Sequence, residues 1–115
     1  MNKKIIEMIE YPKEGISSKV IAQSDDLEVT LFCMAKDTDI SNHTSTKAGT
    51  VYVVEGDGVF NLEGEDIEMK AGTLIFMKKD AVHSLRANEN TTFVLTLINN
   101  IQLNNSEVKD EESKN

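Results

Sequence analysis

The sequence lacks the features that several classes of protein require. Cys33 is its only cysteine, which excludes an intramolecular disulfide framework. Its apolar runs reach only about five residues, too few for a membrane-spanning helix. Asp and Glu number 20 against 12 Lys and Arg, so the formal net charge is −8 and no basic stripe is present. The chain is therefore expected to bind neither nucleic acid nor an anionic membrane surface.

Targeting and nucleotide-binding signals are also missing. Residues 1–15 contain no continuous apolar segment of the kind found in signal peptides, so we expect a reducing, cytoplasmic location. Gly56 and Gly58 are not followed by the third glycine and the helix of a phosphate-binding loop. No internal repeat is visible, and helical periodicity is absent from the middle of the chain.

What the chain does contain is a series of short segments rich in Val, Ile, Leu, Thr and aromatic residues, separated by turn-forming residues. From residue 50 onward a new segment starts about every eight to ten residues. This pattern predicts an all-β domain, a sandwich or small antiparallel barrel, with at least six strands and no helix longer than one turn across residues 27–98. The predicted strands are 27–35, 50–55, 58–64, 65–70, 73–77, 82–87 and 91–98.

Some segments carry more specific signals. The sequence around Gly64 predicts a β-hairpin, in which this glycine supplies a backbone angle that other residues avoid. Residues 73–77, TLIFM, form the most apolar of these segments, which is typical of a strand buried on both faces. Residues 18–23 favour a strand and residues 4–11 are ambiguous, while Pro12 between them marks a turn or a strand edge.

The last residues differ in composition from the rest of the chain. Residues 104–115 are polar and charged, with almost no apolar side chain to offset the entropy cost of ordering. The sequence therefore predicts one folded domain over residues 1–103 and a disordered polar tail over residues 104–115.

A spaced motif in the middle of the chain resembles the first motif of the cupin superfamily, whose general form is G(X)5HXH(X)3–4E(X)6G. Aligned on Gly56, this motif places Asp37 at the first glycine and His43 at the first histidine. Ser45 falls at the second histidine and Gly49 at the glutamate. The spacing between the motif positions is retained, although most of the motif residues are replaced by others.

The second cupin motif, G(X)5PXG(X)2H(X)3N, maps without a gap onto the segment from Gly72 to Ala87. Lys78 and Asp80 stand at its proline and second glycine, and His83 stands at its histidine. The chain is thus similar to small single-domain bacterial cupins. The resemblance implies a double-stranded β-helix, which is a small antiparallel β-barrel, and a homodimer.

In complete cupins three histidines and one glutamate hold a metal ion, so the resemblance implies a site around His43 and His83. Imidazole suits Fe, Ni, Cu or Zn, and a carboxylate extends the range to Mn. Two interpretations remain open. The two histidines hold one divalent metal ion that water, substrate or another group completes, or they hydrogen-bond a ligand in a metal-free polar pocket. In either case we expect them to lie close together in one cavity, with Ser45 on the same side.

These interpretations lead to two functions of different classes. One is a small-molecule-binding protein whose pocket is lined by His43, Ser45 and His83 and holds a polar ligand. The other is a metal-dependent enzyme, an oxygenase, isomerase or decarboxylase, with a reduced site of two histidines. The first is favoured because Gly49 stands at the family's glutamate position, so no carboxylate is placed in the lumen for general acid–base catalysis.

Other residues near these motifs have simpler interpretations. Cys33 is interpreted as a buried apolar side chain rather than a third metal ligand. Lys78 and Lys79 are interpreted as part of a solvated turn rather than a lip that binds substrate. Strand alternation predicts that a set of inward-facing residues forms the barrel lining or core. These residues are Val51, Val53, Leu85, Ala87, Phe93, Leu95 and Leu97.

Overall fold

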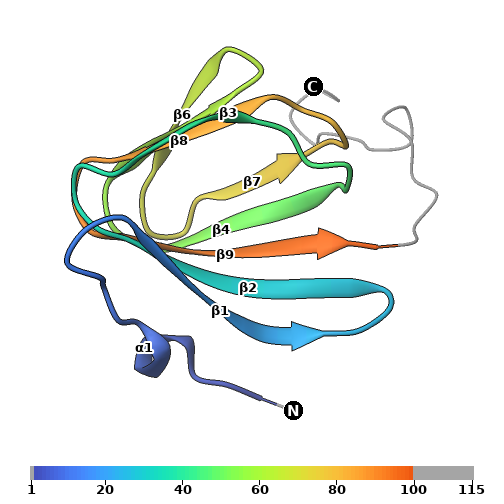
Figure 1. The fold of residues 1–115 in the computed structure, drawn as a ribbon, viewed down its shortest axis with the longest axis horizontal. Coiled ribbons are helices and arrows are strands. Elements are labelled where there is room, and N and C mark those ends of the chain that lie inside the picture. The colour runs from blue at the N-terminus through green and yellow to red at the C-terminus, as the bar shows by residue number, and fades with distance from the viewer. Residues whose placement is uncertain (1, 100–115) are drawn as a thin grey trace.

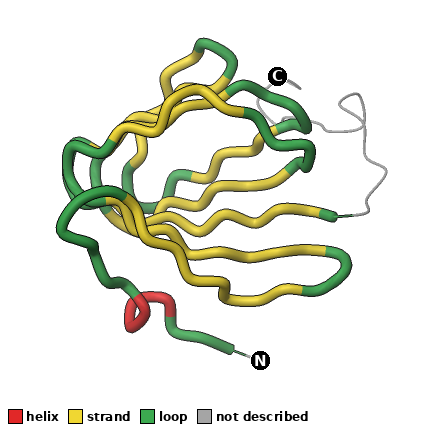
Figure 2. Tube along the Cα trace, in the orientation of Figure 1, coloured by secondary structure: helices red, strands yellow, loops and turns green. Residues whose placement is uncertain are grey.

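The computed structural model describes residues 2–99, and most of them are in strands (Figure 2). One short helix, α1 (Ile5–Met8), precedes nine strands in this part of the chain. Residues 27–98 contain eight of these strands and no helix, which confirms the predicted all-β domain. The strands are β1 (Ile16–Gln23), β2 (Leu27–Met34), β3 (Asp39–His43), β4 (Gly49–Glu55), β5 (Gly58–Leu62), β6 (Glu65–Met69), β7 (Leu74–Met77), β8 (His83–Ala87) and β9 (Thr91–Ile98).

The strands form two antiparallel sheets that face each other as a double-stranded β-helix (Figure 1). The large sheet has five strands in the order β1-β2-β9-β4-β7, and the small sheet has four in the order β3-β8-β5-β6. From β2 onward the chain crosses repeatedly between the two sheets. Strands distant in sequence therefore become neighbours, such as β4 beside β9 and β3 beside β8. The first pairing lies within the large sheet and the second within the small sheet.

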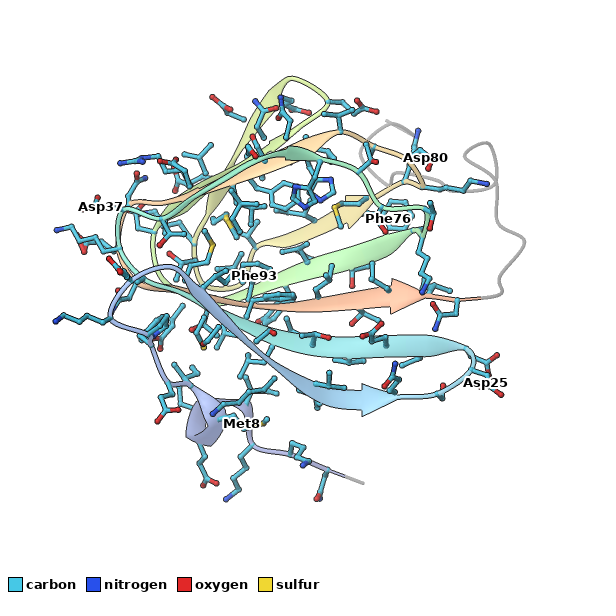
Figure 3. The ribbon with its side chains drawn as sticks, in the orientation of Figure 1. Met8, Asp25, Asp37, Phe76, Asp80 and Phe93 are labelled. Atoms are coloured by element: carbon cyan, nitrogen blue, oxygen red, sulfur yellow. The ribbon has the colours of Figure 1, made fainter. Side chains whose placement is uncertain are left out.

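The core lies between the two sheets, where alternation along each strand sends one set of side chains inward. Phe93 of β9 is buried there and stacks on Phe32 of β2, with ring centroids 5.2 Å apart. Figure 3 shows Phe93 between the layers. Of the predicted inward-facing residues, Val51, Val53, Leu85, Ala87 and Phe93 are buried, and Leu95 and Leu97 are half-buried. The prediction of the lining is thus confirmed for the buried residues.

β5 and β6 form the predicted hairpin. Its turn consists of Glu63 and Gly64, with φ of 51° and 88°. A two-residue turn with positive φ at both positions matches the twist of the flanking strands, and glycine adopts that angle without strain. The assigned role of Gly64 is confirmed.

Two strands differ from the sequence prediction. The prediction that residues 73–77 are buried on both faces is wrong, because β7 is the edge strand of the large sheet and Leu74 is 66% exposed. Only its inward side chains, Ile75 and Met77, are covered by the small sheet. The second difference is β3, which the sequence did not predict as a strand. Its residues are mostly polar because β3 is the edge strand of the small sheet.

The N-terminal segment covers part of the outer face of the large sheet (Figure 1). The phenol of Tyr11 donates to Glu55 Oε2 at 2.7 Å and accepts from the hydroxyl of Thr92 at 2.6 Å. These bonds tie the segment to β4 and β9. Cys33 lies beside Thr92 and is 2% exposed, which confirms its interpretation as a buried side chain.

Within residues 2–99, no helix is long and apolar enough to cross a membrane. The domain boundary at residue 103 and the tail over residues 104–115 lie outside the described residues, so both stay predictions.

Candidate functional site

A β-bulge in β3 places His43 opposite His83. In the β3–β8 pair, Ile40 lies opposite Leu85 and His43 lies opposite His83. Regular alternation from the inward-facing Ile40 would bring Asn42 opposite His83 and would turn His43 outward. One extra residue in β3 resets the alternation, so that both histidines face the space between the sheets.

The imidazole rings of His43 and His83 are in contact. Their centroids are 4.0 Å apart and the ring planes are inclined by 58°. His83 is 5% exposed and stacks on Phe60 of β5 with a centroid distance of 5.6 Å. His43 is exposed at the end of β3. The predicted proximity of the two histidines is confirmed, and their contact with a ligand stays a prediction.

Backbone carbonyls determine which nitrogen of each ring carries a proton. His43 Nδ1 lies 3.0 Å from the Ser41 carbonyl oxygen, and His83 Nδ1 lies 3.0 Å from the Ala81 carbonyl oxygen. A carbonyl oxygen only accepts, so each Nδ1 carries a proton and donates. Burial lowers the pKa of His83, against the opposing effect of the Ala81 hydrogen bond, so its imidazole is neutral at pH 7. Its Nε2 is then an acceptor, and no residue within 2–99 donates to the Nε2 of either ring.

The turns before β3 and β8 have a left-handed backbone at the two positions where the family motifs have glycine and this chain has aspartate. Asp37 and Asp80 have φ of 69° and 65°. Aspartate adopts this left-handed region more readily than most residues with a side chain. The other mapped glycines, Gly56 and Gly72, also have positive φ, at 122° and 93°. The Asp80 N–H donates to the Ser45 carbonyl oxygen at 2.8 Å, which joins the loops on either side of the histidine pair.

Both histidines line a cavity of about 90 Å³ between the sheets. The rest of its lining is apolar and comes from both sheets: Ile16, Phe32, Ile40, Val51, Phe60, Met77, Leu85, Phe93 and Leu95. The expectation of a polar pocket is therefore wrong for the described residues, because the inward positions of these strands are the apolar ones. The two imidazoles are the only polar side chains in this lining.

The two remaining family ligand positions add no donor to the cavity. β3 ends at His43, so strand alternation does not extend to Ser45, which lies in the next loop and is not among the lining residues. Its hydroxyl accepts from the Lys47 N–H at 3.1 Å. At Gly49 an added Cβ would overlap the carbonyl oxygen of Thr96 on β9. The contact of Ser45 with a ligand stays a prediction.

The residues present match only two coordination positions of a metal ion. The Nε2 atoms of His43 and His83 belong to the tautomer that binds metals, since each Nδ1–H is held by a carbonyl. Residues 2–99 contain no group of three or more His, Cys, Asp or Glu side chains able to hold an ion. Cys33 is on the opposite face of β2 from the cavity residue Phe32. Two imidazoles alone hold a divalent ion weakly, so this set does not fit a resident metal.

Sequence reasoning missed most of the apolar lining. Phe60 follows the alternation of its predicted strand, and that signal was available, whereas Ile40 lies in β3, which the sequence did not predict as a strand. Ile16 was not identifiable in this way, because its place in the cavity depends on how β1 packs beside β2. Lys78 and Lys79 are exposed in the turn and do not line the cavity, as the solvated-turn interpretation predicts.

Comparisons with known proteins agree with this arrangement. Residues 30–99 match the family described as "Cupin domain". A conserved protein of unknown function from Streptococcus pyogenes has a TM-score of 0.77 at 21% identity, covering 88% of this chain and 89% of that one. A cupin superfamily protein from Desulfitobacterium hafniense has a TM-score of 0.76 at 16% identity, covering 82% and 86%. An RmlC-like cupin from Shewanella frigidimarina has a TM-score of 0.71 at 18% identity, covering 76% and 79%. No curated protein sequence matches this chain.

Proposed function

Because the chain belongs to the cupin family, we propose that it binds a small molecule between its two sheets, with His43 and His83 as the polar anchors of that ligand. One observation carries the proposal. Two touching imidazoles, one of them 5% exposed, present Nε2 acceptors without protein partners to a cavity of about 90 Å³. His83 Nε2 is not a fully buried unpaired atom and His43 is exposed, so a donor from outside the protein can reach both nitrogens. A bound ligand would supply the donor.

Binding is favoured over catalysis by what surrounds the histidines. The cavity lining contains no carboxylate, hydroxyl or thiol among the described residues. General acid–base catalysis needs groups placed to give and take protons, and here the imidazoles would have to do both.

A metal-dependent enzyme, an oxygenase, isomerase or decarboxylase, is the second candidate. The observation in its favour is that both Nε2 atoms have the tautomer required to bind a metal. An ion such as Fe, Mn, Ni, Cu or Zn would need its other ligands from water or substrate. Such an ion would exchange readily and would not be a resident part of the protein.

The proposal is tested by NMR on protein labelled with ¹⁵N in its two histidines, in buffer with a chelator. A panel of small alcohols, phenols, carboxylates and sugars is added compound by compound. We expect at least one compound to shift the imidazole signals of both histidines, and His43→Ala to weaken its binding. Because His43 is exposed, this substitution should leave the fold intact. A panel in which no compound reaches either ring contradicts the proposal.

The second candidate is tested on the same protein with metal ions alone. Elemental analysis after purification without added metal should find less than one equivalent of any transition metal, and Zn²⁺ should bind weakly. One full equivalent of a metal, lost in both His43→Ala and His83→Ala, would favour the metal-dependent enzyme instead.

A further inference from the structure

We propose that the ligand of this pocket is a small molecule with an apolar body and a single O–H or N–H donor, and that the donor points at the Nε2 atoms of His43 and His83. This inference rests on the function proposed above and adds the chemical class of the ligand. Three properties of the cavity support it: its size, the nature of its walls and the direction of its hydrogen bonds.

The size of the cavity limits the body of the ligand to about one ring. Its volume is about 90 Å³. An apolar cavity of roughly 150 Å³ is known to hold benzene, so a single ring would fill this smaller cavity and extend into its open side. The walls give little room for expansion, because Val51, Phe60 and Met77 are 1–3% exposed in a packed core. The exposed His43 marks the side on which the ligand can reach solvent.

The walls select against ligands with many polar groups. Phe32 and Phe93 line the cavity from the large sheet, and Phe60 lines it from the small sheet. Among residues 2–99, the only polar side chains that line the cavity are the two imidazoles. A sugar or an amino acid would lose water from several polar groups and would find no replacement partners. A ligand with an apolar body and one polar group would keep all its hydrogen bonds.

The direction of the hydrogen bonds requires that the ligand be the donor. Both Nδ1–H groups are occupied by the carbonyls of Ser41 and Ala81, which leaves only the Nε2 lone pairs facing a ligand. An ether or a ketone offers only acceptors, so the lone pairs of its oxygen would be repelled by the lone pairs of the Nε2 atoms. A hydrocarbon would leave both Nε2 atoms unpaired. A hydroxyl or N–H group satisfies one Nε2 directly and lies beside the other, since the two rings are 4.0 Å apart.

The test compares three probes of similar shape and one polar probe: phenol, toluene, anisole and glycerol. Phenol carries a hydroxyl where toluene has a methyl group, and anisole has an acceptor at the same place. Dissociation constants come from titrations at neutral pH, and the imidazole ¹⁵N signals report which nitrogen is contacted. We expect phenol to bind roughly tenfold to a hundredfold more tightly than toluene or anisole, because they leave the acceptors unpaired. The Nε2 signals should shift, and the Nδ1 signals should not.

Two variants locate the effect. His43→Phe keeps an aromatic ring at an exposed position and removes one acceptor, so phenol should lose affinity while toluene does not. Thr44→Ala, in the exposed loop and outside the cavity lining, should change neither. Equal binding of phenol and toluene overturns the donor requirement. Tighter binding of glycerol than of phenol, with shifts at both histidines, overturns the ligand class and leaves the proposed function standing. If none of the four probes shifts either ring, the ligand class is wrong, and the broader panel described above decides the proposed function separately.

Discussion

Replacing Gly49 with the glutamate of the family motif should lower the free energy of unfolding without creating a metal site. A Cβ at Gly49 would overlap the Thr96 carbonyl oxygen and lie 3.0 Å from Leu97 Cδ2, so β9 must shift to admit any side chain. Overpacking of this kind costs about 1–3 kcal/mol. In Gly49→Ala the lower chain entropy of alanine offsets about 0.5–1 kcal/mol of that cost. We therefore expect Gly49→Ala to lose about 0–2.5 kcal/mol of unfolding free energy.

Gly49→Glu adds a carboxylate on the inward face of β4, where it has no described partner. An uncompensated buried charge costs about 3–5 kcal/mol, which exceeds the overpacking cost in Gly49→Ala. For a domain of this size, 1 kcal/mol corresponds to a change in Tm of roughly 4 °C, so the Glu variant should melt roughly 12–20 °C lower. Thr46→Glu, which adds the same side chain in an exposed loop, should stay within about 0.5 kcal/mol of the unsubstituted chain.

The assay is denaturant unfolding followed by far-UV circular dichroism, with a chelator and then with Zn²⁺. Stability of Gly49→Glu equal to that of the unsubstituted chain would show that β9 moves easily, and the steric argument would fail. Recovery of stability with Zn²⁺, absent in the unsubstituted chain, would show that the carboxylate completes a site with His43 and His83. That result would refute the conclusion that the backbone of β9 leaves no room for a metal-binding side chain at position 49.

Three further predictions concern the scaffold and the assembly. Tyr11→Phe should cost about 1–3 kcal/mol, because the buried Thr92 hydroxyl loses the acceptor that Tyr11 provides. Burial, with the nearby Glu55 carboxylate, raises the pKa of Tyr11 from 10.0 to about 12. The phenol's contribution to stability should thus be complete below pH 10 and be lost as the pH rises through about 12, and unfolding curves at several pH values should lack this loss in Tyr11→Phe. Asp80→Gly should be as stable as the unsubstituted chain or slightly more so, whereas Asp80→Val should lose about 1–2 kcal/mol at a φ of 65°, and equal stability of the two variants would contradict the backbone argument. We expect a homodimer, as family membership suggests, so light scattering after gel filtration should give twice the 12.8-kDa chain mass, and a single chain mass would refute it.

The sequence by itself determined the local structure of most of the barrel. Alternating and β-branched segments predicted β2 and the strands from β4 onward, because period-two patterns depend only on which side of a strand each residue takes. The turn at Gly64 followed from the same local chemistry. The spacing of His43 and His83 relative to Gly56 and Gly72 identified the candidate site, since that spacing reflects where two strands begin and end.

Long-range pairing decided the rest. Whether a strand is central or at an edge depends on its neighbours, and for that reason the apolar β7 proved to be an edge strand with Leu74 exposed. The bulge in β3, which turns His43 rather than Asn42 inward, exists only in its register with β8. The approach of Thr96 to Gly49 depends on β4 lying beside β9. Only the packing of the two sheets brings apolar side chains from distant segments around the histidines. The cavity is apolar because those side chains line it.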